Sequence, residues 1–332
     1  GIQKDLDDGI DTIGKKMTVC QLYAKQIRHR GNVRYNTKNG RKRLMKLLEE
    51  DKLGGCPIDS VKLSDAKEWA IRMKEKGISY KTISNDKRSL KAAFYTAIQD
   101  DCIRKNPFDF QLNTVIEDDT EPKVPLTPAQ EESFLSFAQN DKVYQKYYDE
   151  LIILLGTGLR ISELCGLTDT DINFENRIIN VDHQLLRSAE TGYYIETPKT
   201  KSGIRQIPMS EKVYEAFNRV LKRRRGAKAV TIDGYSNFLF LNRDGYPKTA
   251  TNYDGMFRGL AKKYNKYHEE ALPKVMTPHT LRHTFCTNMA NAGMNPKALQ
   301  YIMGHSNITM TLNYYAHATF DSAKAEMLRI AA

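Results

Sequence analysis

The sequence predicts a mainly α-helical protein with one small antiparallel β-sheet, divided into two domains. The chain has 332 residues, and a domain usually holds about 150, so two domains are expected. Apolar residues recur at helical spacing over most of the chain. One interlude, over 178–209, alternates in the manner of strands.

The charge of the chain narrows the class of partner. Lys and Arg number 51 against 40 Asp and Glu, which gives a formal net charge of +11 and a pI near 9.2. This excess favours a polyanionic partner, either nucleic acid or an anionic membrane surface. Hydrophobic residues make up 40% of the chain, enough to bury real cores, so wholesale disorder is excluded.

The sequence also indicates where the protein works. No apolar run approaches the roughly 20 residues that a transmembrane helix needs, and the N-terminus lacks the layout of a signal peptide. The five cysteines are odd in number and scattered, without a C-x-x-C pair, which argues against a disulfide framework or a zinc site. We therefore expect a soluble cytoplasmic protein with no membrane partner.

Residues 17–110 are predicted to be helical throughout, after an N-terminal extension over 1–16. The clearest helix runs from Tyr80 to about Ile98, with an apolar stripe on one side and Ser79 as its cap. Basic residues gather on the outer faces of this helix and of an earlier one: Lys81, Lys87, Arg88, Lys91, Arg41 and Arg43. Any one of these could merely solvate a helix face, but their accumulation favours contact with phosphates.

An exposed linker is predicted over 111–125, because this segment is acidic and contains two prolines. Thr127 and Pro128 then provide a helix start, so the second domain runs over 126–332 and ends in an amphipathic tail helix.

Strands are expected within the second domain at 178–181, 193–197 and 205–209. The last two alternate around the polar stretch 200–203, so we expect them to form a hairpin with this stretch near its tip.

Four short segments of the second domain concentrate reactive side chains. In chain order, the side chains are Arg160, Lys199, His279, Arg282, His305 and the adjacent pair Tyr314 and Tyr315. The first arginine follows a glycine turn, and the lysine occupies the expected hairpin tip. His279 and Arg282 are three positions apart at the start of a helix, so they share one face. A lone H-x-x-R pair would be weak evidence, but the ordered set is specific.

The chemistry that suits this set is phosphoryl transfer to a tyrosine. A tyrosine hydroxyl can attack a DNA phosphodiester and form a phosphotyrosyl link, which conserves the energy of the bond for rejoining. Guanidinium groups grip phosphate oxygens as a fork, so Arg160 and Arg282 suit the role of a clamp. His279 and His305 can donate hydrogen bonds to the phosphoryl oxygens or help to manage the tyrosine proton.

The ordered set resembles that of the tyrosine site-specific recombinases, the phage integrase family. The segment YKTISNDKRSLKAAFYTAIQDDCIRKNPF is similar to the core-binding domain of this family, and the chain looks nearest to integrases of conjugative transposons and temperate phages. The resemblance implies a helical core-binding domain over 17–110, a catalytic domain over 126–332, and no metal or other cofactor. It also implies that Lys199 is the general acid that protonates the leaving 5′-oxygen. Lys201 is expected to contact backbone phosphate or solvent.

The choice of nucleophile rests on spacing. In members of the family the tyrosine usually follows the Gly-His histidine by nine positions, which selects Tyr314. Consecutive helical residues point about 100° apart, so only one of the pair can face the phosphate. Tyr315, followed by Ala316 and His317, resembles a Tyr-x-His ending of relatives and stays the alternative. Glu163 either orients the site or is an ordinary surface carboxylate.

The predicted function is site-specific recombination that integrates and excises a mobile element through a 3′-phosphotyrosyl intermediate. The expected partner is double-stranded DNA at a recombination site, which would place the protein on the nucleoid. The resemblance implies a homotetramer on DNA with contacts through the C-terminal tail, and we expect an excisionase or a host DNA-bending protein as a further partner. Two alternatives stay open: a type IB topoisomerase-like enzyme and a non-catalytic basic DNA-binding regulator. No metal site is expected, since the histidines lack compact zinc spacing and arginines nearby would repel a cation.

Overall fold

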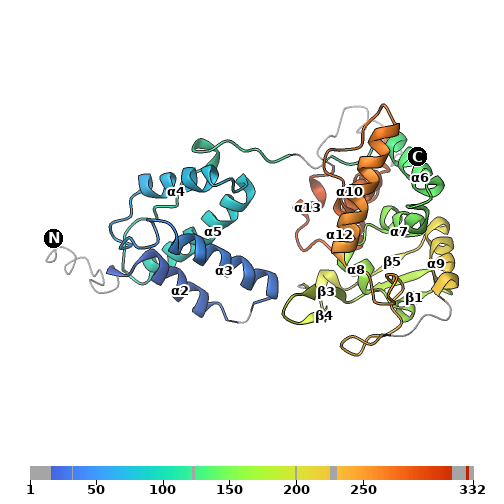
Figure 1. Ribbon diagram of the computed structural model, residues 1–332, viewed down its shortest axis with the longest axis horizontal. Coiled ribbons are helices and arrows are strands. Elements are labelled where there is room, and N and C mark those ends of the chain that lie inside the picture. The colour runs from blue at the N-terminus through green and yellow to red at the C-terminus, as the bar shows by residue number, and fades with distance from the viewer. Residues whose placement is uncertain are drawn as a thin grey trace. The chain divides into compact units, whose positions relative to one another are not determined.

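The protein consists of two compact units, Gly1–Pro122 and Lys123–Ala332 (Figure 1). Each unit has a hydrophobic core of its own. The computed structural model describes residues 16–31, 33–121, 124–198, 200–224, 230–315 and 327–328. Most of these residues are helical, and the described strands all lie in the second unit, where they form small antiparallel sheets. The mainly α fold class is therefore confirmed.

The regular elements of the described first unit are all helices, but residues 50–62 and 100–110, which lie within the range predicted to be helical throughout, form turns and irregular connections. The helices of this unit are α2 (Val19–His29), α3 (Tyr35–Glu49), α4 (Leu63–Glu75) and α5 (Tyr80–Gln99). The hydroxyl of Ser79 accepts a hydrogen bond from the N–H of Thr82 and so caps α5, as predicted. The core is built around Phe108, whose ring centroid lies 5.8 Å from that of Trp69 and 5.3 Å from that of Phe94.

Part of the segment predicted as an exposed linker, 111–125, is buried in the first unit. Leu112 lies in the short 3-10 turn η2 (Leu112–Thr114) and is 6% exposed, while Ile116 is 8% exposed. Both belong to the core of this unit, and Asp119 accepts a hydrogen bond from Nζ of Lys74. The prediction was wrong here because the acidic composition masked two apolar residues four positions apart, which pack inward together.

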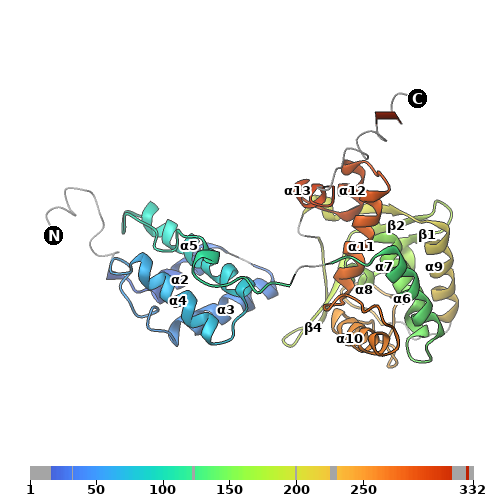
Figure 2. The ribbon, with the colours of Figure 1, turned by 90° about the horizontal axis from the view of Figure 1, so that it is seen from above.

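The second unit contains eight described helices. They are α6 (Pro128–Asn140), α7 (Tyr148–Thr157), α8 (Ile161–Gly166), α9 (Glu211–Arg224), α10 (Ala250–Tyr267), α11 (Pro278–Asn291), α12 (Pro296–Met303) and α13 (Thr309–Leu312). Helix α7 packs against both α9 and α11 (Figure 2), and its apolar residues surround most of its circumference, as burial between two neighbours requires. The helix start predicted at Thr127 is an N-cap position in the structure.

The described strands form two separate antiparallel sheets. These strands are β1 (Ile172–Asn173), β2 (Ile178–Val181), β3 (Gln184–Ser188), β4 (Gly192–Glu196) and β5 (Arg205–Pro208). The three-stranded sheet has the order β1-β2-β5, and β3 pairs with β4 alone. The hairpin predicted between 193–197 and 205–209 is therefore wrong. Strand β5 pairs with β2 instead, because this register places Ile207 opposite Ile179 and buries both.

No helix in the part of the chain that the structure describes combines the length and the apolar character needed to cross a membrane.

We expect Leu112→Ala to lower the free energy of unfolding of the first unit by about 2–5 kcal/mol, since it removes a buried side chain and leaves a cavity. Urea denaturation of the full chain, followed by tryptophan fluorescence, measures this effect. The chain has one tryptophan, Trp69, and it lies in the core of the first unit. The matched control is Leu63→Ala, at a position that is 45% exposed, where a change within about 0.5 kcal/mol is expected. Equal effects of the two variants would contradict the burial of this segment.

Candidate active site

Arg160 lies at the turn between α7 and α8. Gly158 ends α7 in a left-handed conformation with φ +63°, and α8 begins at Ile161. A Cβ atom at Gly158 would collide with the ring of Phe285, so the turn requires glycine for its space as well as for its backbone angle. The turn directs the guanidinium of Arg160 to the end of α12, where Nη2 donates a hydrogen bond to the carbonyl oxygen of Gly304 at 3.0 Å.

A buried carboxylate holds this arginine. Glu163 accepts hydrogen bonds from the backbone N–H of Arg160 at 2.9 Å and from its Nη1 at 2.7 Å. It also accepts two hydrogen bonds from Arg205, at 3.0 and 2.9 Å. Burial raises the pKa of Glu163, but the hydrogen bonds and charge of Arg205, and then the charges of Arg160 and Arg282, outweigh burial and bring the pKa to about 2. Glu163 is therefore not a surface carboxylate, and its hydrogen bonds fix the position of the Arg160 side chain.

Arg282 is buried on α11, between the ends of two other helices. Its Nη1 donates to the carbonyl oxygen of Gly158 at 2.5 Å, and its Nη2 donates to the carbonyl oxygen of Met303. These carbonyls lie at the C-terminal ends of α7 and α12, where the helix dipoles favour a cation. Burial, and then the charge of Arg160, lower the pKa of Arg282 to about 9, so this guanidinium still carries its charge at neutral pH.

His305 follows the end of α12 and is 5% exposed. Its Nδ1 lies 2.9 Å from Oγ1 of Thr311. Burial, and then the charges of neighbouring arginines with Arg282 foremost, lower the pKa of His305 to about 4, so the ring is neutral at pH 7. His279 is exposed in the first turn of α11, and its charge contributes to the same shift, which places it near His305.

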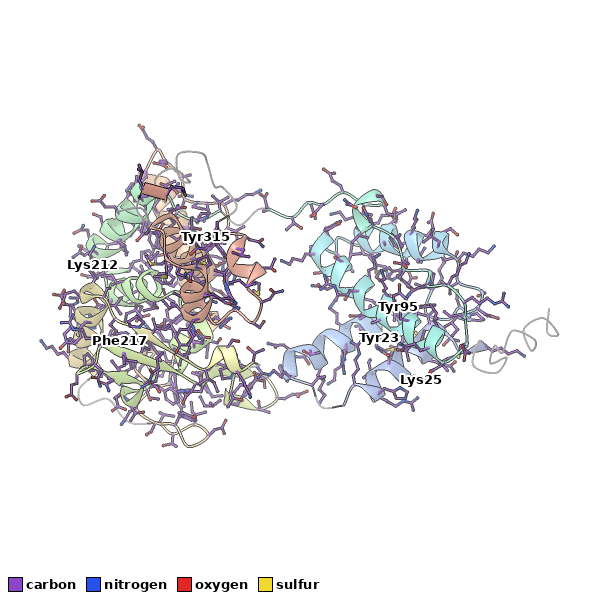
Figure 3. The ribbon with its side chains drawn as sticks, turned by 180° about the vertical axis from the view of Figure 1, so that it is seen from behind. Tyr23, Lys25, Tyr95, Lys212, Phe217 and Tyr315 are labelled. Carbon is purple, nitrogen blue, oxygen red and sulfur yellow. The ribbon has the colours of Figure 1, made fainter. Side chains whose placement is uncertain are left out.

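The two adjacent tyrosines occupy different settings. The hydroxyl of Tyr315 (Figure 3) donates a hydrogen bond to the carbonyl oxygen of Met294 at 2.5 Å. The ring of Tyr314 packs against that of His283, with 4.8 Å between centroids. Burial raises the pKa of Tyr314, and the charge of Arg282 acts against this rise. The hydroxyl of Tyr315 is therefore bound to the backbone, whereas Tyr314 lies close enough to Arg282 for its charge to affect the pKa. We call Arg160, Arg205 and Arg282 the arginine cluster.

The structure brings together most of the residues predicted for the site. Arg160, Arg282 and His305 meet where α7, α8 and α12 end or begin, with His279 and Tyr314 beside them. Lys199 lies outside the described residues.

Lys201 and Arg205 lie in the same region of the chain. Lys201 is exposed in the 3-10 turn η5 (Lys201–Gly203), which connects the two sheets and does not form the tip of a hairpin. Arg205 was missed, because an arginine in a short strand resembles an exposed edge residue. The signal was the alternation of β5, which places Arg205 on the same face as the buried Ile207.

Four of the predicted DNA-contact residues of the first unit keep an exposed or partly exposed position. Lys81 and Arg88 are exposed on α5, and their spacing of seven places them on one side of the helix. The Nζ of Lys87 lies 4.4 Å from the ring centroid of Phe110, and Arg41 is half-buried on α3.

The other two form ion pairs within the first unit. Nζ of Lys91 lies 2.5 Å from Oδ1 of the exposed Asp109, and Nη2 of Arg43 lies 2.5 Å from Oδ1 of the buried Asp86. Loss of Arg43 would leave a buried carboxylate without its partner, so this arginine supports the fold.

One group of potential metal ligands occurs among the described residues: Asp171, Asp182 and His183. Both ring nitrogens of His183 are already engaged, Nδ1 with Asp182 at 2.6 Å and Nε2 with the carbonyl oxygen of Gly166 at 2.7 Å. We interpret this group as a hydrogen-bonded brace between loops and assign no metal to it.

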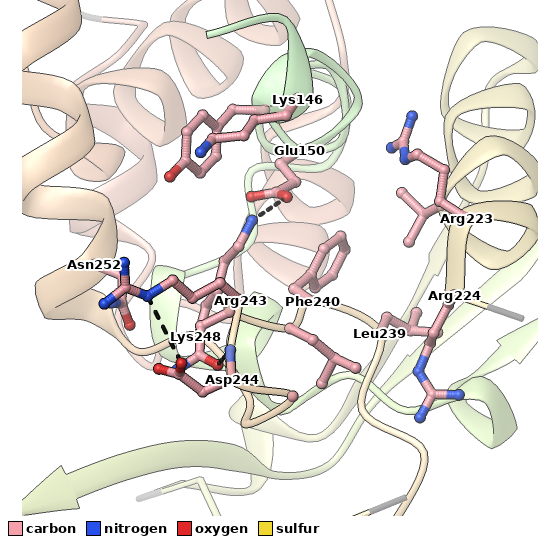
Figure 4. Close-up of a pocket in the computed structure, with 15 residues that line it drawn as sticks. Lys146, Glu150, Arg223, Arg224, Leu239, Phe240, Arg243, Asp244, Lys248 and Asn252 are labelled. Atoms are coloured by element: carbon pink, nitrogen blue, oxygen red, sulfur yellow. Dashed lines mark hydrogen bonds and ion pairs between the residues drawn. The ribbon is translucent and has the colours of Figure 1, made fainter. Parts of the chain in front are cut away.

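A cavity of about 800 Å³ lies elsewhere in the second unit, between α7, α9 and the start of α10 (Figure 4). Two cations on its wall are paired with acids: Lys248 with Glu150 at 2.5 Å, and Arg223 with Asp149 at 2.6 Å. The residues of the arginine cluster do not line this cavity. We therefore identify the candidate active site by its charges and hydrogen bonds and not by this cavity.

Comparison with known proteins decides the family. Residues 125–322 match the phage integrase family, well over half of the chain. The chain belongs to the phage integrase family. It is thus a tyrosine recombinase, an enzyme that cuts and rejoins DNA.

Individual relatives of this phage integrase family member are close. It is 69% identical over 329 residues to the transposase from transposon Tn916 of Enterococcus faecalis, a match that covers 99% of this chain and 81% of that protein. A solved Tn1549 transposon integrase, in complex with circular intermediate DNA, is 78% identical with a TM-score of 0.90 and covers 95% of this chain and 99% of that one. Lambda integrase bound to a core site shares the fold alone, at 16% identity and a TM-score of 0.60, over 90% and 76% of the two chains.

We expect the His305 ring to titrate near pH 4 instead of near the ordinary 6.5. The unfolded chain takes up this proton already near pH 6.5, so His305 should make the folded protein less stable as the pH falls from about 6.5 to about 4. An NMR titration of the histidine ring protons measures the pKa, with His305→Gln to assign the resonance. A titration of His305 close to 6.5 would show that the ring is not enclosed by the arginine cluster.

Proposed function

We propose that Arg160, Arg282 and His305 bind the scissile phosphate of DNA and that Tyr314 attacks it. The observation that carries this proposal is the convergence of two guanidinium groups and a neutral imidazole at one corner, beside a tyrosine. The side chain of Arg160 is 37% exposed, and its bonds to Glu163 and Gly304 use two of its five N–H groups. The remaining donors suit a phosphoryl oxygen.

In the proposed reaction the oxygen of Tyr314 forms a bond to phosphorus, and the bond from phosphorus to the 5′-oxygen breaks. The 3′-end stays joined to the protein as a phosphotyrosyl ester, and the reverse attack by a 5′-hydroxyl rejoins the strand. A tyrosine is a neutral phenol at pH 7, and burial raises the pKa of Tyr314 further, so its proton must leave during the attack. His279 is the exposed base beside the arginines and His305. We assign the protonation of the leaving oxygen to Lys199.

A neutral His305 suits hydrogen bonding better than proton removal. When the hydroxyl of Thr311 donates to Nδ1, the hydrogen of the neutral ring resides on Nε2, which can then donate to a phosphoryl oxygen. Negative charge that develops on this oxygen in the transition state would strengthen the bond.

Two solved relatives support Tyr314 over Tyr315 as the nucleophile. Two of the solved Tn1549 integrase complexes carry single substitutions, one of an arginine and the other of a tyrosine. The interval between those two positions equals the interval between Arg160 and Tyr314 in this chain.

The protein integrates and excises a mobile element by site-specific recombination, and double-stranded DNA is its partner. We assign the grip on DNA to the first unit and the chemistry to the second. We further propose a homotetramer on two DNA sites, with the C-terminal tail joining protomers and an excisionase or a host DNA-bending protein assisting. Most of this tail, and with it the tail helix predicted from the sequence, lies outside the described residues.

We expect the protein to form a covalent adduct with a nicked duplex that carries its recombination site, and Tyr314→Phe to abolish this adduct. Tyr315→Phe should keep it, since that hydroxyl is bound to the backbone of Met294. Arg160→Ala should slow adduct formation by about 10²–10³ by removing one anion-stabilising group. Denaturing gel electrophoresis of labelled DNA measures the adduct.

The same substrate separates the alternative functions. A regulator without catalytic activity would give no adduct with any site, and loss of the adduct in Tyr315→Phe alone would reverse the choice of nucleophile. A topoisomerase would reseal one duplex, whereas a recombinase yields recombinant product from two sites.

Lys81→Ala and Arg88→Ala should each weaken DNA binding at every sequence and reduce the slope of log affinity against log salt by about 1. Both side chains are exposed on one side of α5. The matched control is Lys52→Ala, an equally charged, exposed position in the turn after α3. Fluorescence anisotropy over a salt series measures the slope. An unchanged slope in both α5 variants would remove this helix face from the DNA interface.

A further inference from the structure

Arg205 is a charged side chain that is completely enclosed. It lies on β5, and its side chain is 0% exposed. Besides its two bonds to Glu163, its Nε donates to the carbonyl oxygen of Ile302 at 2.6 Å, and its Nη1 donates to that of Gly203 at 3.2 Å. A buried guanidinium is tolerated only when acceptors surround it in this way. Because it is enclosed, Arg205 is not placed to touch DNA.

The four acceptors of Arg205 belong to three segments that carry the candidate site. Glu163 lies in α8 and holds Arg160 through two further bonds. Ile302 lies in the last turn of α12, just before His305. Gly203 ends the turn that follows Lys199 in the chain. One guanidinium therefore joins the start of α8, the end of α12 and this turn.

The approach of α12 to this guanidinium is close. Gly304 ends α12 with φ +61°, and a Cβ atom there would lie 3.1 Å from Nη1 of Arg205 and 3.0 Å from the carbonyl oxygen of Ser202. Arg160 donates to the carbonyl oxygen of this same glycine. The position of His305 relative to Arg160 is therefore set by contacts that pass through Arg205 and Gly304.

We propose that Arg205 is a positioning residue for DNA cleavage, which acts by holding Glu163 against Arg160 and by fixing the end of α12 beside them. The inference rests on the proposed function, since it takes Arg160 and His305 as groups that bind the phosphate. It adds a residue that touches neither DNA nor the nucleophile.

The charge of Arg205 gives the proposal a specific signature. Three guanidinium groups act on Glu163. Arg205 belongs to β5, Arg160 directly precedes α8, the helix of Glu163, and Arg282 belongs to α11. Burial by itself raises the pKa of this carboxyl, and Arg205 is the main group that lowers it. Without Arg205 the carboxyl should therefore take up a proton at a higher pH than about 2, and it would then bind Arg160 less firmly.

The test measures single-turnover adduct formation from pH 5 to 8 for the full chain and for Arg205→Gln and Arg205→Lys. We expect Arg205→Gln to cleave about 10- to 100-fold more slowly, to lose further activity as the pH falls, and to bind DNA within about threefold of the unsubstituted protein. Lysine keeps the charge but cannot form the paired bonds, so Arg205→Lys should also be slower without the added loss at low pH.

The matched control for lost stability is Arg72→Gln in the first unit. Arg72 makes the same kind of paired contact with the buried Asp51, at 2.8 and 2.7 Å, and belongs to the unit that contains none of the candidate active-site residues. Circular dichroism melts compare the stability of all variants. Where Arg205→Gln does not fold, the rate and pH profile of Arg205→Lys decide.

Three outcomes would overturn the inference: Arg205 variants that cleave at the unsubstituted rate and pH profile, a loss of rate that matches lost DNA binding, or an equal loss in Arg72→Gln at equal stability. If the unsubstituted protein itself forms no adduct, the proposed function fails. If it forms the adduct and the Arg205 variants do so equally, only the role of Arg205 fails.

Discussion

The carboxylate of Glu163, enclosed between Arg160 and Arg205, is the interaction on which the rest of the candidate site depends. Three guanidinium groups, including that of Arg282, lie close enough to lower the pKa of this carboxyl. Like charges at such separations repel, and burial strengthens the repulsion. The ionised carboxylate of Glu163 offsets part of this repulsion between the guanidinium groups. Because its oxygens accept hydrogen bonds in fixed directions, it also orients the guanidinium of Arg160.

The C-terminal ends of two helices also offset the positive charge of the arginines. Arg282 is bound by carbonyl groups at the ends of α7 and α12, where the helix dipoles are negative. Both ends are closed by glycines with positive φ, Gly158 and Gly304, which bring the carbonyls and the side chains into close approach. Burial, and then the surplus of positive charge, lower the pKa of His305 to about 4 and keep its ring neutral at pH 7. The guanidinium groups and the neutral ring are thus preorganised to bind an anion.

The net charge of +11 divides between several uses. In the second unit, buried arginines such as Arg205 serve the internal order of the site. In the first unit, Arg43 neutralises the buried Asp86, whereas Lys81 and Arg88 remain exposed on α5. Composition counts all of these residues alike. Their separation into structural and exposed cations depends on which acids the fold places beside them.

The sequence by itself determined the fold class, the helix starts and the family, because caps such as Ser79 and the ordered motif from Arg160 to Tyr314 are local in the chain. Tertiary structure decided three things that local patterns do not contain. It paired β5 with β2, it buried Leu112 in the first core, and it enclosed Arg205 with Glu163, 42 positions away in the chain. The physical reason is the same in each case: burial and hydrogen-bond partners come from distant segments, so a residue's neighbours in sequence do not reveal them.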